Sequence, residues 1–367
     1  MMSIKNRILR HSNQFEYYKN QTKNLNVKIN ELENEINKLK NEKTKAENEF
    51  LDDAIREKYV EGISVIIPSY KGADHIDCLL NSLEKQTLDS DKYDLIFIIN
   101  GELDSTIEKI RDFKNRNPEK NVIMNFSSIG NVSNARNIGL TVARRNYVTF
   151  IDDDDFISPN YLKMLYKYSA PNRITMTNFM DYNLKEKKEL ESRVVPFSLD
   201  KKGIIENAYF DFPSLNSITV AKSVPTHAAK SIKFNFNLKN GVDISYFTRL
   251  YSKFDFEFYF IDKSEEAIYY RVLRANSVSR QKYSYDFNVL QKLQVMDDIN
   301  FAMKYATNEK DMEFLKLRMD SASGFIVKYL RKYPKDKQKV IDEINKHNFI
   351  YFSFFRINAI KDNEYED

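Results

Sequence analysis

Two patterns of apolar residues divide the chain. From Phe15 to Phe50, mostly apolar residues recur at steps of three and four, with polar residues between them. This heptad spacing predicts a long helix with one narrow apolar stripe, which is typical of a coiled coil. We therefore expect residues 1–60 to join two copies of the chain into a homodimer. A trimer, or a single helix packed back on its own domain, stays open.

From Gly62 onward, short apolar runs alternate with stretches of helical spacing. The apolar runs predict strands over 63–67, 94–99, 122–124 and 147–151. The helical spacing predicts helices over 74–86, 104–113 and 133–143. Strands that alternate with helices indicate an α/β fold, in which a mostly parallel sheet has helices on both faces.

Beyond residue 280 the strand signal ends. Helical spacing predicts helices over 286–305, 311–333 and 337–346. We therefore expect three parts: the N-terminal helix 1–60, a domain over 61–282 with halves 61–170 and 171–282, and a helical region over 283–367. The aromatic run 349–355 is expected to pack into a core, with an exposed contact patch as the alternative.

Composition excludes several classes of protein. The 57 basic and 53 acidic residues leave a net charge of +4, and such a balance does not indicate nucleic-acid binding. The single cysteine, Cys78, excludes an internal disulfide and suits a reducing compartment. No apolar run approaches the roughly 20 residues of a membrane span, and no signal peptide is evident. We expect a cytoplasmic protein, and the basic amphipathic residues 4–10 leave a peripheral membrane contact open.

Polar segments follow three of the predicted strands, at 68–70, 100–102 and 152–155. The carboxyl ends of parallel strands border one crevice, so these segments are expected to meet there. Segment 152–155 is four consecutive aspartates, whose mutual repulsion a divalent cation such as Mg²⁺ or Mn²⁺ would offset. Asp152 and Asp154 are expected on the same side of an extended chain. A solvated acidic loop is the alternative.

Residues 62–280 resemble a family 2 glycosyltransferase with the GT-A fold, particularly the bacterial enzymes that decorate capsule, teichoic acid or lipopolysaccharide. The matching segments are 63–70, 78–87, 130–140, 150–155 and 268–271 with 277–280. Their order and spacing carry the resemblance. It implies a donor that is a nucleotide-diphosphate sugar, UDP-linked in the first instance, and a Mn²⁺ or Mg²⁺ cofactor. The implied acceptor is a hydroxyl of a surface polysaccharide, a teichoic-acid-type polymer or a lipid-linked glycan.

The resemblance also assigns residues to the site. The nucleotide-sugar site would include Pro68, Ser69, Tyr70, Asn100, Ser133, Arg136, Asn137, Asp152 and Asp153. Asp154 and Asp155 would bind the metal. Arg136 has a second interpretation, in which its salt bridge braces the acidic loop. Asn100 stands where the family usually has an aspartate, which weakens the case for uridine.

An inverting transfer needs a base for the acceptor hydroxyl. Relatives use a Glu-Asp pair where this chain has Val242 and Asp243, so Asp243 is the expected base, with a helix cap as its alternative role. His227 is the alternative base, and Lys230 matches a lysine often found before the acceptor region. A nucleotidyltransferase, or a non-catalytic scaffold that retains the fold, stays open as a second function.

Overall fold

The computed structural model describes residues 28, 31, 32, 35, 58–192, 202–206, 208–211, 217–273, 284–306 and 308–358. It divides into two compact units, Met1–Glu57 and Lys58–Asp367. The described residues of the first unit are helical and exposed. The rest of the predicted coiled coil, and the motif expected at 277–280, lie outside the described residues.

Among the described residues of the second unit, the larger sheet has eight strands. In spatial order they are β3 (Asn121–Ser127), β2 (Tyr93–Asn100), β1 (Val60–Ser69), β4 (Arg145–Phe150), β10 (Lys222–Pro225), β6 (Arg173–Met176), β11 (Glu257–Phe260) and β9 (Gly203–Ile204). The first four are parallel, whereas β10 is antiparallel to both of its neighbours. The predicted α/β fold with a mostly parallel sheet is confirmed. Between β1 and β4 the strand order reverses, which places a crevice at their carboxyl ends.

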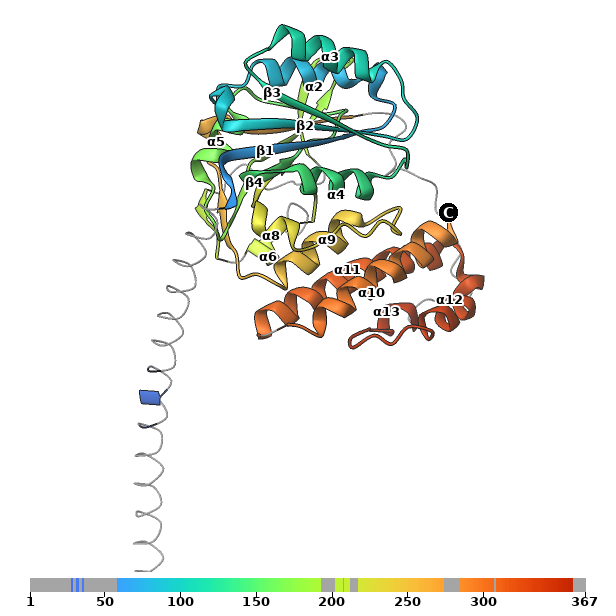
Figure 1. Ribbon diagram of the computed structural model, residues 1–367. Helices are drawn as coiled ribbons and strands as arrows, with labels where there is room; N and C mark the ends of the chain where they lie inside the picture. The colour runs from blue at the N-terminus through green and yellow to red at the C-terminus, as the bar shows by residue number, and fades with distance from the viewer. Residues whose placement is uncertain are drawn as a thin grey trace, which may run out of the picture. The chain divides into compact units, whose positions relative to one another are not determined.

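Helices cover both faces of this sheet. Figure 1 shows α2 (Ile76–Glu84) and α3 (Thr106–Arg116) on one face of β1–β3, and α4 (Val132–Val142) on the other. α4 packs very closely, because a Cβ at Gly139 would lie 2.3 Å from Cγ2 of Ile66 in β1. A glycine at this position therefore lets the helix approach the strand that ends at the crevice.

A smaller sheet flanks the end of β4. In spatial order its strands are β5 (Phe156–Ile157), β12 (Ile268–Val272), β7 (Asn178–Asn183) and β8 (Lys188–Glu191). The four aspartates stand between β4 and β5, so the two sheets hold the acidic segment at both of its ends. The helices that connect these strands are α5 (Tyr161–Tyr168), α6 (Ala208–Asp211), α8 (Thr226–Lys230) and α9 (Val242–Tyr251).

The predicted C-terminal helical region is confirmed, although its division from the preceding domain at residue 283 stays a prediction. Its elements are a π-helical turn (Asp286–Leu290), α10 (Gln291–Met303), α11 (Glu309–Lys332), α12 (Lys337–Ile344) and α13 (Phe355–Asn358). α10 packs against α9 and α11 (Figure 1). In the aromatic run, Phe349, Phe352 and Phe354 pack against the core without forming a strand, while Ile350 is 55% exposed.

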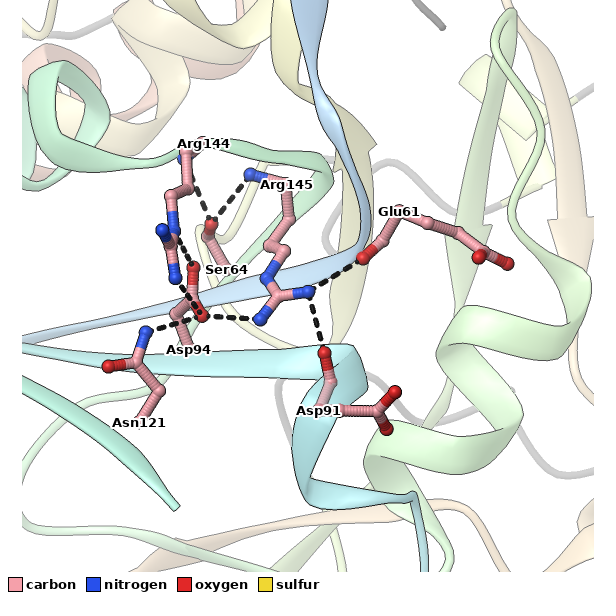
Figure 2. Close-up of polar contacts among 7 residues, drawn as sticks. All are labelled: Glu61, Ser64, Asp91, Asp94, Asn121, Arg144 and Arg145. Carbon is pink, nitrogen blue, oxygen red and sulfur yellow. Dashed lines mark hydrogen bonds and ion pairs between the residues drawn. The ribbon is translucent and has the colours of Figure 1, made fainter. Parts of the chain in front are cut away.

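A buried ion cluster connects β1, β2 and β4 where these strands begin, at the end of the sheet away from the crevice. Figure 2 shows Asp94 of β2 between two arginines: Arg145 donates to it at 2.7 Å and Arg144 at 3.0 Å. Arg145 also donates to the carbonyl oxygens of Glu61 and Asp91, at 2.8 and 2.7 Å. Although burial alone would raise it, hydrogen bonds from the two arginines hold the pKa of Asp94 below its usual value.

Candidate active site

The three polar strand ends meet at the crevice, as the sequence predicts. The side-chain amide of Asn100, at the end of β2, donates to the carbonyl oxygen of Ser69 at 2.7 Å. The hydroxyl of Ser69, at the end of β1, donates to Asp153 at 2.5 Å. These bonds join β1, β2 and the acidic segment into one wall. The side-chain NH2 group of Asn100 is therefore already hydrogen-bonded within the protein.

The acidic segment is a turn, and the expectation of an extended chain there is wrong. The backbone N–H of Asp155 donates to the carbonyl of Asp152 at 3.2 Å, so side chains do not alternate along it. Asp152, Asp154 and Asp155 instead direct carboxylate oxygens to within 4.8 Å of one another. Asp153 turns away, toward Ser69 and toward His75 at 3.4 Å.

The geometry of the turn fits a divalent cation. Three carboxylate oxygens within 4.8 Å of one another match the hard oxygen ligands that Mg²⁺ and Mn²⁺ prefer. Asp155, however, accepts hydrogen bonds from the Tyr269 hydroxyl at 2.7 Å and the Val272 N–H at 2.9 Å. Burial, with the charges of Asp154 and Asp152, raises the pKa of Asp155 well above its usual value. Asp155 thus anchors the turn to β12, and Asp154 is the more accessible ligand.

Arg136 of α4 links the acidic turn to the other wall of the crevice. Its buried guanidinium donates to Asp152 at 3.2 Å and to Asp243 at 2.8 Å. The bracing role proposed for Arg136 is therefore observed, and it extends to a second carboxylate. Desolvation raises the pKa of Asp152 to about 6 against the opposing charge of Arg136, and Asp154 and Asp243 add to the rise.

Asp243 faces the crevice from the first turn of α9. It is the second residue of that helix, and its side chain is 32% exposed. The N-cap position belongs to Gly241, in a left-handed conformation with φ 69°, and no side chain caps the helix there. The alternative role of Asp243 as a helix cap is therefore not observed. A partly exposed carboxylate across from Asp152 suits a base.

The remaining nucleotide-side residues divide into two groups. The ring of Tyr70 is 51% exposed and lies beside Gly101, where a Cβ would be 2.6 Å from the ring. The hydroxyl of Ser133, one turn before Arg136 in α4, is buried and has no hydrogen-bond partner within the described part of the chain. Tyr70 and Ser133 can both contact a ligand, the Tyr70 ring by stacking and the Ser133 hydroxyl by hydrogen bonding.

Pro68 and Asn137 serve the fold. Pro68 is buried within β1 opposite Ile98 of β2, one residue before the strand ends. Asn137 donates to the carbonyl of Phe234 and accepts from its N–H, both at 2.9 Å. Both polar groups of the Asn137 side chain thus bind the loop before α9, and its nucleotide contact stays a prediction.

His227 and Lys230 lie far from this crevice. The ammonium nitrogen of Lys230 is 5.6 Å from the centre of the Tyr59 ring, and Tyr59 directly precedes β1. The crevice lies at the other end of that strand. Ten residues of strand correspond to about 30 Å. Desolvation, with the charge of Lys58, lowers the pKa of His227 to about 4. The expected acceptor-side roles of these residues are corrected, because β10 runs antiparallel to β4 and delivers α8 to the opposite edge.

Two buried residues near the site had no predicted role. Tyr269 donates to Asp155 and accepts from the Asp152 N–H at 3.2 Å, so one hydroxyl fixes both ends of the turn. Lys222 is fully buried at the start of β10, with its ammonium group 4.1 Å from the centre of the Phe247 ring. The Ile-Tyr-Tyr-Arg segment at 268–271 was a signal for Tyr269, whereas no local pattern marks Lys222.

The reversed strand order marks a ligand-binding crevice at the carboxyl ends of the strands, and the acidic turn and Asp243 border it. The fold is of the GT-A type, which the solved structure described below shares. Residues 64–223 match the family model for Glycosyl transferase family 2, so this segment is similar to the domains of that family. None of the described helices is long and apolar enough to cross a bilayer.

The relatives include enzymes named for one polymer. Poly(ribitol-phosphate) beta-N-acetylglucosaminyltransferase TarP of Staphylococcus aureus is 27% identical over 315 residues, which cover 77% of this chain and 92% of TarP. Poly(ribitol-phosphate) beta-glucosyltransferase of Bacillus spizizenii is 29% identical over 140 residues, 38% of this chain but only 21% of that protein. The crystal structure of S. aureus TarS 1–349 in complex with UDP-GlcNAc superposes with a TM-score of 0.58 at 20% identity, covering 78% of this chain and 83% of that one. This likeness shows the shared fold.

Proposed function

We propose that the chain transfers a sugar from a UDP-sugar, with UDP-GlcNAc as the first candidate, to a hydroxyl of a poly(ribitol phosphate)-type polymer, with inversion at the anomeric carbon. The observation that carries this proposal is the Arg136 bridge between Asp152 and Asp243. It holds a carboxylate suited to act as base across the crevice from the acidic turn. The names of the relatives and the UDP-GlcNAc in the similar structure support the choice of polymer and donor.

The nucleotide would lie over the carboxyl ends of β1 and β2. The half-exposed ring of Tyr70 offers an aromatic face to the base, and the buried hydroxyl of Ser133 offers a hydrogen bond. Asp152, fixed by Arg136 and by the Tyr269 hydroxyl, would contact the ribose or the sugar. These groups would bind and orient the donor without taking part in bond making.

Asp243 would act on the acceptor. Its carboxylate removes the proton from the attacking hydroxyl while the oxygen forms a bond to the anomeric carbon. The bond between that carbon and the diphosphate oxygen breaks, and the nucleoside diphosphate leaves. Arg136 keeps Asp243 directed into the crevice, so the base meets the face of the sugar opposite the leaving group.

Asp154, with Asp152 beside it, would hold Mn²⁺ or Mg²⁺. When bound, such an ion neutralises the negative charge that develops on the departing diphosphate. Asp155 supports the arrangement by fixing the turn to β12 through Tyr269 and Val272.

The test is transfer of radiolabelled GlcNAc from UDP-GlcNAc to poly(ribitol phosphate), with Mn²⁺ or with EDTA. We expect labelled polymer with a β-linkage by NMR in Mn²⁺, and little label in EDTA. Asp243→Asn is expected to bind UDP as the wild type does and to transfer at least about 100-fold more slowly. Asp297→Asn, an exposed carboxylate on α10, is the control. Label absent from the polymer with the wild-type chain contradicts the donor and acceptor, and full activity of Asp243→Asn contradicts the base.

We also propose that residues 1–60 pair two copies of the chain in the cytoplasm, with the basic segment 4–10 touching the membrane surface. Leu32, at a predicted d position, is helical and 50% exposed, which supports pairing. Sedimentation velocity is expected to give a dimer for the wild type and for Glu31→Gln, and a monomer for Leu32→Asp. Co-sedimentation with anionic vesicles tests the membrane contact, and recovery of the chain only in the supernatant contradicts it.

A further inference from the structure

The segment that carries Asp243 is held by the C-terminal helix α10. The side chains involved are Gln291, Lys292, Val295 and Asp298. Their spacing of one, three and three residues places them on one face of the helix. This face covers residues 235–245, which include the base proposed above. The C-terminal region is therefore part of the wall of the site.

Two polar contacts fix the chain just before α9. The ammonium group of Lys292 donates to the side-chain oxygen of Asn240 at 2.5 Å. The side chain of Gln291 accepts a hydrogen bond from the backbone N–H of Lys239 at 3.0 Å. Asn240 in turn donates to the carbonyl of Phe287, in the π-helical turn that leads into α10, at 3.3 Å. The residues next to Gly241 are thus tied to α10 from two directions.

At Gly241 the backbone itself touches α10. A Cβ there would lie 2.7 Å from Cγ2 of Val295 and 3.7 Å from the Lys292 ammonium nitrogen. The φ of 69° is one that glycine adopts readily and other residues rarely do. This conformation turns the chain into α9, and Asp243 follows two residues later. The direction of the Asp243 side chain therefore depends on this contact.

A further contact lies one turn along both helices. Asp298 accepts hydrogen bonds from the hydroxyl of Ser245 and from the side-chain amide of Asn235, the latter at 3.0 Å. Ser245 is fully buried, two residues after Asp243. Residues on both sides of the proposed base are therefore bound to the same face of α10.

Lys292 places its ammonium group in a buried position. It is only 5% exposed, and its ammonium group lies 4.3 Å from the centre of the Phe325 ring of α11. Burial lowers the pKa of Lys292 to about 8. Burying an ammonium group is unfavourable unless it is hydrogen-bonded, and the side-chain oxygen of Asn240 provides such a bond. This arrangement makes the Asn240 bond a strong local constraint.

We infer that Lys292 is a positioning residue for sugar transfer, which acts through Asn240 and Gly241 to set the direction of Asp243. This inference rests on the proposed function. It concerns the rate of the chemical step, since Lys292 itself contacts neither the acidic turn nor Tyr70 in the described structure. Small displacements of a catalytic group reduce turnover strongly, while donor binding on the other wall is unaffected.

The test compares Lys292→Met with the wild type in the transfer assay above. Methionine retains the packing on Phe325 and removes the hydrogen bond to Asn240. We expect kcat to fall about tenfold or more, with the KM for the donor and the Kd for UDP within twofold of wild type. Lys328→Met is the matched control, because Lys328 also lies over the Phe325 ring, at 5.5 Å, but is exposed.

A double-mutant cycle separates positioning from general loss of structure. If Lys292 acts through Asn240, then Asn240→Ala lowers kcat in the wild-type background and adds little in the Lys292→Met background. A kcat for Lys292→Met equal to that of the wild type, or additive effects of the two substitutions, overturns the inference. So does a fall in kcat that is matched by an equal loss of UDP binding. An inactive wild type overturns the proposed function instead.

Discussion

The guanidinium of Arg136 lies 2.8 Å from the carboxylate of Asp243, although 107 residues separate them in the chain. The same guanidinium reaches Asp152, so one buried cation connects the two walls of the crevice. One wall consists of the ends of β1 and β2 with the acidic turn, and the other is the start of α9. The bridge fixes the width of the crevice between them.

Replacing Arg136 tests this bridge. Arg136→Met leaves both carboxylates without their cation and is expected to lower the free energy of unfolding by about 2–3 kcal/mol. This is below the loss for a fully buried pair, because Asp152 and Asp243 remain about a third exposed. Arg136→Lys is expected to recover part of the stability but not the transfer rate, because an ammonium group cannot bind two carboxylates as a planar guanidinium does. Urea unfolding and the transfer assay measure the two effects; equal recovery of both contradicts the bridge.

Asp154 and Asp155 are adjacent but are expected to respond differently. Asp154→Asn is expected to weaken Mn²⁺ binding, measured by calorimetry, at least about tenfold, because it replaces a charged ligand. Asp155→Ala leaves the Tyr269 hydroxyl and the Val272 N–H without their partner, and is expected to cost about 2–3 kcal/mol of stability. Thermal unfolding without metal distinguishes them: only Asp155→Ala should lower Tm. A large loss of Tm for Asp154→Asn would contradict this division.

Two glycine substitutions are expected to have opposite signs. Gly139→Ala places a methyl group 2.3 Å from Ile66, so it is expected to destabilise the fold by about 1–3 kcal/mol through overpacking. Gly324→Ala in α11 meets no atom within 4 Å, and is expected to stabilise the helix by about 0.5–1 kcal/mol. Chemical denaturation of the two variants gives both values. Equal effects would show that α4 does not approach β1 as closely as described.

The Asp94 cluster is expected to make stability depend on acid pH. The folded-state pKa of Asp94 is below its usual value. The ionised side chain therefore contributes to the free energy of unfolding above about pH 4, and this contribution is lost as the pH falls through the folded-state pKa. Asp94→Asn is expected to cost about 3 kcal/mol at pH 7, because it removes one partner of a buried ion cluster. The difference from wild type should shrink below pH 4. Asp89→Asn, at an exposed aspartate, is the control, and a pH-independent difference contradicts the prediction.

The first four strands and the meeting of their ends were predictable, because both follow from local patterns. Short β-branched runs marked β1, β2 and β4, and parallel strands bring their carboxyl ends to one edge. The shape of the acidic segment was not predictable from alternation. A single backbone bond from Asp155 to Asp152 turns the chain and brings Asp155 to the same side as Asp152 and Asp154.

The unpredicted features depend on contacts between residues distant in the chain. Nothing near Asn137 indicates that Phe234 will occupy both of its polar groups. The position of His227 depends on the direction of β10, which is antiparallel in a sheet whose first strands are parallel. The hydroxyl of Tyr269 reaches the acidic turn because β12 pairs with β5. Such relationships come from topology, which spacing in the sequence does not encode.

The place of β10 also determines which fragments of the chain can stay monomeric. β10 is the partner of β4 on one side, but residues 151–221 separate the two strands in the chain. A fragment that ends before Lys222 therefore exposes the unpaired N–H and C=O groups of β4, and such an open edge invites pairing with other chains and aggregation. Any shortened version meant for crystallisation should extend through Pro225, and the ribosome-bound chain has the same open edge until that strand emerges.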